Sequence, residues 1–244
     1  WSSDVCSSDL FGMNAAGTDA KMRNTKESIL EAQFTSGAGN WCTWMFGRDL
    51  VNWNNNFTWA KWVTPSRDLI SAFKQEGDEV RFKESIVYYD CNWSNYYPSD
   101  NYPFMYKCRS ANSSIIKYRY ADVLLLKAEA LIMQDTPDLE GAADIIDEVR
   151  DRAKLGALPT SVRSNKNVLL NALLKERRLE LAFEGQRWFD LVRLDKVEEV
   201  MNAVYSKDSG RKAQIYTFDK NSYRLPIPQS VIDANDKIHQ NPGY

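Results

Sequence analysis

The sequence contains few of the residues from which metal centres and catalytic nucleophile–base pairs are built. Its 244 residues include one histidine, His239, and four cysteines without a Cys-x-x-Cys pair. A structural zinc site needs four Cys or His ligands at short spacings, so this composition argues against a Cys/His zinc site. The cysteines are expected to be ordinary thiols, with a Cys91–Cys108 disulfide open only in an oxidising compartment. His239 lies in a tail rich in Pro and Asn, so we expect no catalytic nucleophile–base pair.

Excess charge and long apolar runs are also missing. The net charge is −2, and no basic run is interleaved with aromatic residues, which argues against nucleic-acid binding. No apolar run reaches the roughly 18 residues of a membrane-spanning helix. No Gly-rich loop stands between a strand and a helix to bind phosphate. With 43% hydrophobic and 26% charged residues, the chain has the composition of a globular protein with a real core.

Two chemistries based on carboxylates need to be weighed. A glycosidase uses two carboxylates about 5–10 Å apart across a sugar cleft. Asp49, Asp90 and Asp100 are the candidates outside helices, but nothing in their spacing selects a pair, so we expect a protein that is not an enzyme. Asp90 and Asp100, together with Asn carbonyls, leave a structural Ca²⁺ open, although EF-hand spacing is absent. No other cofactor is indicated.

What the sequence does have is an aromatic region. Six of its eight tryptophans lie between Trp41 and Trp93, within residues 11–114, where Gly, Asn and Thr predict loops. An indole or phenol ring stacks on the apolar face of a sugar, and neighbouring amides bind the hydroxyls. Tryptophan is mostly buried in folded proteins, so a small core is the alternative for any single ring. The ligand-binding residues that we predict are Trp41, Trp44, Trp53, Asn55, Trp59, Trp62, Trp93, Tyr96 and Tyr97.

One short helix is expected within the aromatic region, over residues 64–77. Thr64 or Ser66 would cap its start, because their hydroxyls accept hydrogen bonds from the first helical N–H groups. Gly77 would end the helix in the left-handed conformation that glycine adopts readily. The residues expected to face inward are Leu69, Ile70 and Phe73.

Residues 115–205 have the periodicity of packed helices instead, and the Pro-rich tail that completes the region to residue 244 is expected to be extended around Pro226 and Pro228. In residues 120–132 and 139–153 the apolar side chains recur every three or four positions, which predicts two helices that each bury one face. Asp135 and Pro137 break the pattern between them, so the two helices should form an antiparallel hairpin. A third helix is expected to begin near Asn167.

The third helix runs into a charged stretch, "KERRLELAFEGQRW". A charge run of this kind usually forms a solvated helix face with weak ion pairs. If Glu176, Arg178 and Glu180 are buried, they should form a paired network whose loss is costly, and we expect this role to be structural. Trp188 and Phe189, which follow the helical spacing, are predicted to be core residues.

Several segments resemble SusD/RagB proteins, which are outer-membrane nutrient-binding lipoproteins of Bacteroidota. In the helical region the resemblance is carried by "IIKYRYADVLLLKAEALI", "AADIIDEVRDRA", "LLKERRLELAFEGQRWFDLVRL" and the terminal "YRLPIPQSVIDANDKIHQNPGY". "KESILEAQF" at residues 26–34 and "DEVRFKESIV" at residues 78–87 also fit, so the match runs in order over residues 26–244. The pairing of "ERRLELAFEGQRWFDL" with "LPIPQS…QNPGY" is its most specific part.

The resemblance implies a mainly α, SusD-like fold, with irregular TPR-like helical hairpins packed against a loop-rich, aromatic, ligand-binding region. It implies non-catalytic binding of a glycan or oligosaccharide nutrient for a SusC-like TonB-dependent transporter, at the outer leaflet of the outer membrane. Family chains are longer, so these residues correspond to the C-terminal half, without the lipoprotein signal and its lipid anchor. The binding residues of the family vary too much to be transferred individually.

The first ten residues, "WSSDVCSSDL", show neither apolar periodicity nor a signal-peptide pattern. They resemble the in-frame translation of a common sequencing adapter, so we expect residues 1–10 to be non-native and Cys6 not to be a lipidation site. The expected division is then residues 1–10, an aromatic ligand-binding region at 11–114 and a helical region at 115–244, the last two in one incomplete domain. A helical-repeat scaffold that binds a protein rather than a sugar is the alternative function.

Overall fold

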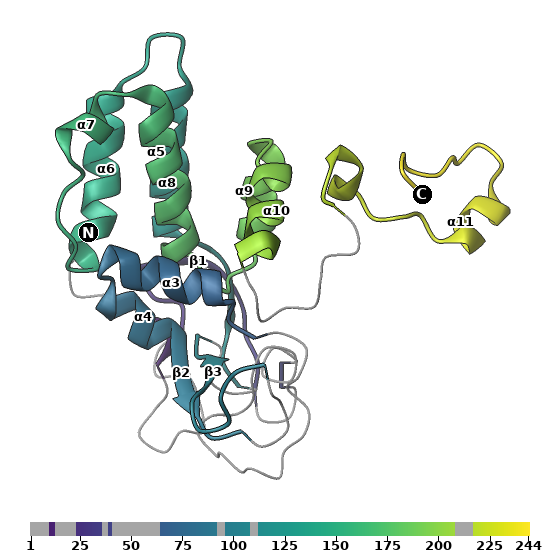
Figure 1. Cartoon of the computed structure of the whole chain (residues 1–244), viewed down its shortest axis with the longest axis horizontal. Helices are drawn as coiled ribbons and strands as arrows, with labels where there is room; N and C mark the ends of the chain where they lie inside the picture. The colour runs from purple at the N-terminus through teal and green to yellow at the C-terminus, as the bar shows by residue number, and fades with distance from the viewer. Residues whose placement is uncertain are drawn as a thin grey trace. The chain divides into compact units, whose positions relative to one another are not determined.

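The computed structural model describes residues 10–12, 23–35, 39–40, 64–91, 96–107, 112–207 and 217–244. The chain divides into two compact units, Trp1–Gln186 and Arg187–Tyr244. Helices predominate in both, and short strands occur in the first (Figure 1). Across these described ranges, no helix combines the length and the apolar character needed to cross a lipid bilayer.

Three helices form the core of the first unit: α5 (Tyr120–Met133), α6 (Leu139–Arg152) and α8 (Lys166–Glu180). They run side by side in Figure 1, and the short α7 (Thr160–Arg163) lies between α6 and α8 in the chain. Their apolar stripes meet in one cluster, which consists of Leu124, Leu125, Ala128, Ile132, Ala142, Ala143, Ile146, Val149, Leu169 and Leu173. The predicted hairpin and the predicted third helix are therefore confirmed.

Asparagine and aspartate side chains fix where two of these helices begin. Asp138 accepts a hydrogen bond from the N–H of Gly141 at 2.9 Å, at the start of α6. Asn165 accepts from Asn167 at 3.1 Å and from Val168 at 3.2 Å, at the start of α8. Each cap satisfies backbone donors that the first helical turn leaves open, so the turns between the helices are encoded locally.

The short helix expected in the aromatic region is α3 (Arg67–Glu76). Of the two proposed caps, Ser66 is the one used, and its hydroxyl accepts from the N–H of Leu69 at 3.1 Å. Gly77 ends the helix with a φ of 70°, the left-handed conformation that favours glycine. A second short helix, α4 (Glu79–Ser85), follows directly and was not predicted as a separate element.

Two antiparallel ribbons join distant parts of the first unit. The strand β1 (Ser28–Ala32) pairs with β4 (Ile115–Arg119), and β2 (Ile86–Tyr89) pairs with β3 (Tyr102–Met105). The sequence analysis predicted loops for β1, β2 and β3 and placed β4 in the helical region, because strands of four or five residues are too short for an alternating pattern to stand out. The first ribbon connects the two regions that the sequence divides at residue 114, so β4 begins the helical region while pairing with the aromatic one.

The second unit contains short helices: α9 (Arg187–Arg193), α10 (Val197–Lys207), the 3₁₀ helix η1 (Lys220–Tyr223) and α11 (Gln229–Ala234). The prediction that Trp188 and Phe189 are core residues is wrong. Phe189 is 66% exposed and Trp188 is 36% exposed, and the residues of α9 that are buried are Asp190 and Leu191.

Amide side chains hold the C-terminal tail together. Gln240 uses both ends of its amide on Ile227: its Oε1 accepts from the backbone N–H at 2.8 Å, and its Nε2 donates to the carbonyl at 2.9 Å. Asn241 donates from Nδ2 to the carbonyl of Leu225 at 2.6 Å. These bonds satisfy backbone groups that have no strand partner, and they pair the two parts of the "LPIPQS…QNPGY" motif.

Candidate functional site

A network of buried ion pairs surrounds the last turn of α8. Glu176 and Glu180 lie one turn apart on the buried side of this helix, and Glu184 follows in the turn after it. The expected buried network is therefore confirmed, although Arg178 pairs with Asp68 on α3 instead of joining it. Its members are Glu27, Asp78, Arg81, Lys107, Arg119, Arg150, Arg152, Glu176, Glu180 and Glu184.

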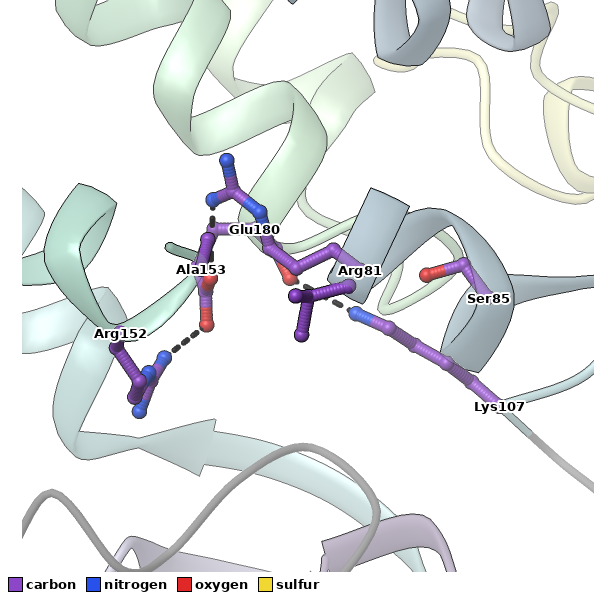
Figure 2. Close-up of a pocket in the computed structure, with 7 residues that line it drawn as sticks. Arg81, Ser85, Lys107, Arg152, Ala153 and Glu180 are labelled. Atoms are coloured by element: carbon purple, nitrogen blue, oxygen red, sulfur yellow. Dashed lines mark hydrogen bonds and ion pairs between the residues drawn. The ribbon is translucent and has the colours of Figure 1, made fainter. Parts of the chain in front are cut away.

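Glu180 is the centre of this network, and each of its carboxylate and carbonyl oxygens accepts hydrogen bonds. Oε1 accepts from Arg119 at 2.6 Å and also from Arg152, and Oε2 accepts from Arg81 at 3.1 Å. The carbonyl oxygen accepts from Lys107 at 2.8 Å and from Arg119 at 2.7 Å. Figure 2 shows Arg81, Arg152 and Lys107 reaching Glu180 from different elements. Its carboxylate thus ties α8 to α4, α6 and β4, and its carbonyl oxygen ties α8 to the segment after β3.

Arg119, the last residue of β4, bridges three carboxylates with one guanidinium group. Its Nη1 donates to Glu27 at 3.0 Å, and its Nε donates to Glu184 at 2.6 Å, in addition to its bonds with Glu180. Glu27 Oε1 also accepts from the N–H of Ala121 at 3.2 Å, in the first turn of α5. Because the guanidinium is planar and its donors are fixed, this arrangement sets the start of α5 against the end of α8.

The network is built to hold the fold rather than to react. Its members comprise five carboxylates and five basic side chains, and its carboxylates face arginine or lysine. A general base or nucleophile needs a lone pair that a substrate can reach. A buried, balanced set of charges instead makes the removal of any one partner costly. We therefore assign the "ERRLELAFEGQRW" charges a structural role.

Other candidate groups for chemistry contribute little in the described part of the chain. No group of three or more His, Cys, Asp or Glu residues within the described ranges is arranged to hold a metal ion. His239 is exposed in the tail. Cys91 is a buried free thiol, and Cys108 lies outside the described residues.

Four carboxylates of the network have shifted pKa values, and the shifts run in two directions. Burial alone would raise the pKa of Glu180, but Arg119 and the other surrounding cations hold that pKa well below its ordinary value. Burial also opposes ionisation of Glu184, and Arg119 again outweighs it and lowers the pKa. For Asp78 and Glu176 burial dominates over their arginine partners and raises the pKa.

Acid should destabilise the chain through the two carboxylates with lowered pKa. Glu180 and Glu184 have an unfolded pKa of about 4.3, so their stabilisation is complete above that pH and is lost as the pH falls through the folded values. Asp78 and Glu176 act in the opposite sense, because their pKa values are raised. Their contribution to stability is present at low pH and is lost as the pH rises through the folded pKa values. The pKa of Glu180 is the most strongly shifted of the four. We therefore expect the urea concentration at the unfolding midpoint to decrease once the pH is lowered past about 4. A midpoint that rises on acidification would contradict this balance.

Of the predicted ligand-binding residues, the structure describes Tyr96 and Tyr97. The two rings form an edge-to-face pair, with centroids 4.9 Å apart and planes at 87°. The guanidinium of Arg67 lies over both rings, 4.0 Å from the centre of Tyr96 and 4.6 Å from that of Tyr97. It also donates to the carbonyl of Tyr96. The remaining predicted residues lie outside the described ranges: Trp41, Trp44, Trp53, Asn55, Trp59, Trp62 and Trp93.

Tyr97 also serves the core beneath this pair. Its hydroxyl donates to the carbonyl of Pro65 at 2.7 Å, and its ring meets Tyr102 edge-on with centroids 5.6 Å apart. Tyr102 is 3% exposed and shares a hydrogen bond with Thr64. Tyr97 therefore anchors the pair to the buried end of β3, and both rings of the pair are half-buried.

Arg67 is a residue of this cluster that the sequence analysis missed. It occupies the first position of α3, where the positive end of the helix dipole disfavours a basic side chain. That local conflict is the signal that could have found it. Stacking on two aromatic rings offsets the unfavourable position, because a cation over a ring face is attracted by the ring's quadrupole.

The described residues define a class of protein: it is mainly helical, its packed hairpins are held together by a buried charge network, and an aromatic cluster lies beside the β2–β3 ribbon. A family model described as the SusD family matches residues 102–244. This is more than half of the chain, and the chain belongs to the SusD family. The mainly α, SusD-like fold expected from the sequence is thereby confirmed.

Individual relatives agree with this assignment. The chain is 43% identical over 99 residues to SusD-like protein P38 of Formosa agariphila, which covers 38% of this chain and 19% of that protein. It matches the structure of a laminarin-binding SusD-like protein with a TM-score of 0.65 and 24% identity, over 98% of this chain and 53% of the other. It matches surface glycan-binding protein A from Bacteroides thetaiotaomicron with a TM-score of 0.69 and 19% identity, over 97% and 55%. The chain thus spans about half the length of the solved proteins that it resembles.

Proposed function

We propose that this protein binds a glycan or oligosaccharide nutrient without changing it chemically. The observation that carries the proposal is the fold, which matches a laminarin-binding and a glycan-binding protein over nearly the whole chain. Membership of the SusD family supports the same function. The pairing of the buried carboxylates with arginine and lysine also supports it, because charges held in this way are poorly suited to acid–base chemistry.

The binding surface that we propose is aromatic. Its rings are Trp41, Trp44, Trp53, Trp59, Trp62, Trp93, Tyr96 and Tyr97, with Asn55 as a hydrogen-bonding partner. A half-buried ring held rigidly in place loses little conformational freedom when a sugar stacks on it, so its contact area is used efficiently. The Tyr96–Tyr97 pair has this character, because Arg67 and Pro65 fix its position. We infer that residues 11–114 supply the surface and residues 115–244 support it.

We also propose where the binding takes place. A protein of this kind would sit on the outer leaflet of the outer membrane, attached through a lipid anchor of the intact protein. It would pass its ligand to a SusC-like TonB-dependent transporter. Co-purification of the intact, lipidated protein with the transporter encoded beside it is the direct check.

Affinity electrophoresis tests the binding function. The 244-residue chain is run in native gels that contain laminarin or other polysaccharides, with bovine serum albumin as a non-binding reference. We expect retardation in at least one glycan, and a reducing-sugar assay on the same polymer should detect no new chain ends. Unchanged mobility in every glycan would count against the proposal, and release of new ends would replace it with an enzyme.

A protein-binding scaffold is the second candidate, favoured by one observation. Helix α5 is apolar on two sides, and Val123, Leu126 and Met133 remain 45%, 42% and 53% exposed on its outer side. Hydrogen exchange separates the two functions. A glycan ligand should protect amides in residues 39–107, whereas a protein partner seated on α5 should protect residues 120–133.

A further inference from the structure

The start of helix α3 holds one ring of the aromatic cluster in place. Arg67 is the first residue of α3, and its guanidinium lies 4.0 Å from the centre of the Tyr96 ring. The same guanidinium donates a hydrogen bond to the carbonyl of Tyr96. One side chain thus contacts both the ring and the backbone of Tyr96, so the position of this ring depends on where the first turn of α3 lies.

The apolar contacts of α3 attach the helix to α8 without fixing its first turn. Ile70 and Phe73 of α3 are 8% and 1% exposed, and they share one apolar cluster with Leu179 of α8. Apolar burial is non-directional and does not by itself select one position of a helix along its axis. Charge-assisted hydrogen bonds have a defined geometry and can make that selection.

Asp68, which follows Arg67, makes such a hydrogen bond to α8. Its Oδ2 accepts from Nη2 of Arg178. The side chains of Arg178 and Asp68 are 20% and 28% exposed, and an ion pair that water reaches contributes little to stability. The main effect of this pair is therefore geometric, because it places the first turn of α3 against α8.

The other end of α3 has an ion pair of its own. Lys175 of α8 donates to Glu76, the last residue of α3, and Arg150 of α6 donates to the same carboxylate at 2.7 Å. The Lys175–Glu76 pair joins the same two helices as the Arg178–Asp68 pair, but it lies about two helical turns away along α3. The two pairs therefore separate the general attachment of α3 from the position of its first turn.

We propose that Arg178 and Asp68 are positioning residues for the ligand. They fix the first turn of α3, and Arg67 passes this position on to Tyr96. The assignment rests on the proposed function, since it takes Tyr96 to contact the glycan. Within the structural role of the charged stretch, Arg178 thus serves the aromatic cluster, whereas Glu176 and Glu180 serve the buried network.

Affinity electrophoresis of the 244-residue chain, in a glycan that retards the parent, tests this assignment. Arg178→Met should weaken the affinity about two- to tenfold, because an aromatic contact that loses its position loses most of its contribution. Lys175→Met is the matched control, since it removes the pair at the other end of α3, and it should leave the affinity unchanged. A merely structural role of Arg178 would change the affinity of both variants alike.

Further variants show whether the effect passes through Tyr96. The double variant of Tyr96→Ala and Arg178→Met should bind no more weakly than Tyr96→Ala alone, because two residues that act through one contact are not additive. Asp68→Asn removes the same ion pair at nearly constant size, so it should reproduce Arg178→Met and gives the answer if that variant does not fold. Arg178→Lys should recover part of the affinity, because it restores the charge.

The possible results distinguish this assignment from the proposed function. If the parent is retarded and neither Arg178→Met nor Asp68→Asn weakens the affinity, the assignment is overturned and glycan binding stands. Equal weakening by Arg178→Met and Lys175→Met, or an additive loss in the double variant, would overturn the assignment as well. A parent chain that no glycan retards would overturn the proposed function, and the assignment would fall with it.

Discussion

Replacing Arg119 with methionine should lower the free energy of unfolding by about 3–5 kcal/mol, or prevent folding altogether. Methionine keeps the unbranched stem of the side chain and part of its packing volume but removes the guanidinium group and its charge. Glu27, Glu180 and Glu184 would then lose the guanidinium that bridges them, although they stay buried with side chains 1–8% exposed. The cost arises because these three buried carboxylates then share one positive charge fewer, with only Arg81, Arg152 and Lys107 left as partners, and burial disfavours charge that is not fully compensated.

Urea unfolding followed by circular dichroism measures this loss. Lys83→Met is the matched control, since Lys83 pairs with Glu79 at 3.3 Å on the surface, where the side chains are 73% and 70% exposed. An exposed pair contributes only about 0–1 kcal/mol, so the control should unfold almost like the parent chain. Arg119→Lys should recover part of the stability, because it restores the charge without the planar fork. Equal stability of the Arg119 and Lys83 methionine variants would contradict the role of the network.

Helices of the first unit could be predicted because their information is local. The apolar stripes of α5 and α6 recur within one or two turns, and Asp138 and Asn165 cap the helices that they precede. The burial of Glu176 and Glu180, in contrast, depends on residues that are distant in the sequence. A charged run is usually a solvated face, and what makes it a buried one here is the arrival of Arg81 and Arg119 from segments 61–99 residues away.

The strands were missed for the same reason. Ser28 pairs with Arg119 in the β1–β4 register. A strand of five residues contains no pattern that predicts a partner so far away in the sequence. Phe189 shows the opposite error. Its spacing continues a helical stripe, but α9 is a separate helix of seven residues that buries Asp190 and Leu191, so the stripe does not continue into one core.

In the candidate site, the residue types in the sequence pointed to aromatic ligand-binding residues, but the contacts that surround those residues could not be predicted. The sequence identifies Tyr96 and Tyr97 as aromatic candidates for ligand binding. It could not show that the hydroxyl of Tyr97 donates a hydrogen bond within the protein, to the carbonyl of Pro65. Nor does it place Arg67 over the pair, because stacking depends on how the start of α3 meets the segment before β3. The position of Arg67 against the helix dipole is the one local sign of that contact.

Replacing Trp53, Trp59 and Trp62 together with alanine should abolish most of the retardation on a glycan gel. An aromatic contact contributes about 0.5–1.5 kcal/mol beyond the area that it buries, so three rings that share one ligand account for roughly a 10- to 1,000-fold loss of affinity. Tyr96→Ala should have a smaller effect, because one ring is lost instead of three. Phe189→Ala is the control: its ring is 66% exposed in the second unit, and its removal should leave binding unchanged.

Stability measurements on the same variants decide between a binding surface and a core. If the three tryptophans bind a sugar, their removal weakens retardation while the urea midpoint stays close to that of the parent chain. If they are core residues, each substitution by alanine leaves a cavity and costs about 3–5 kcal/mol, so the midpoint falls. A triple variant that is strongly destabilised yet still retarded would contradict the aromatic surface that we propose, since the rings would then serve the fold and the ligand would be held elsewhere.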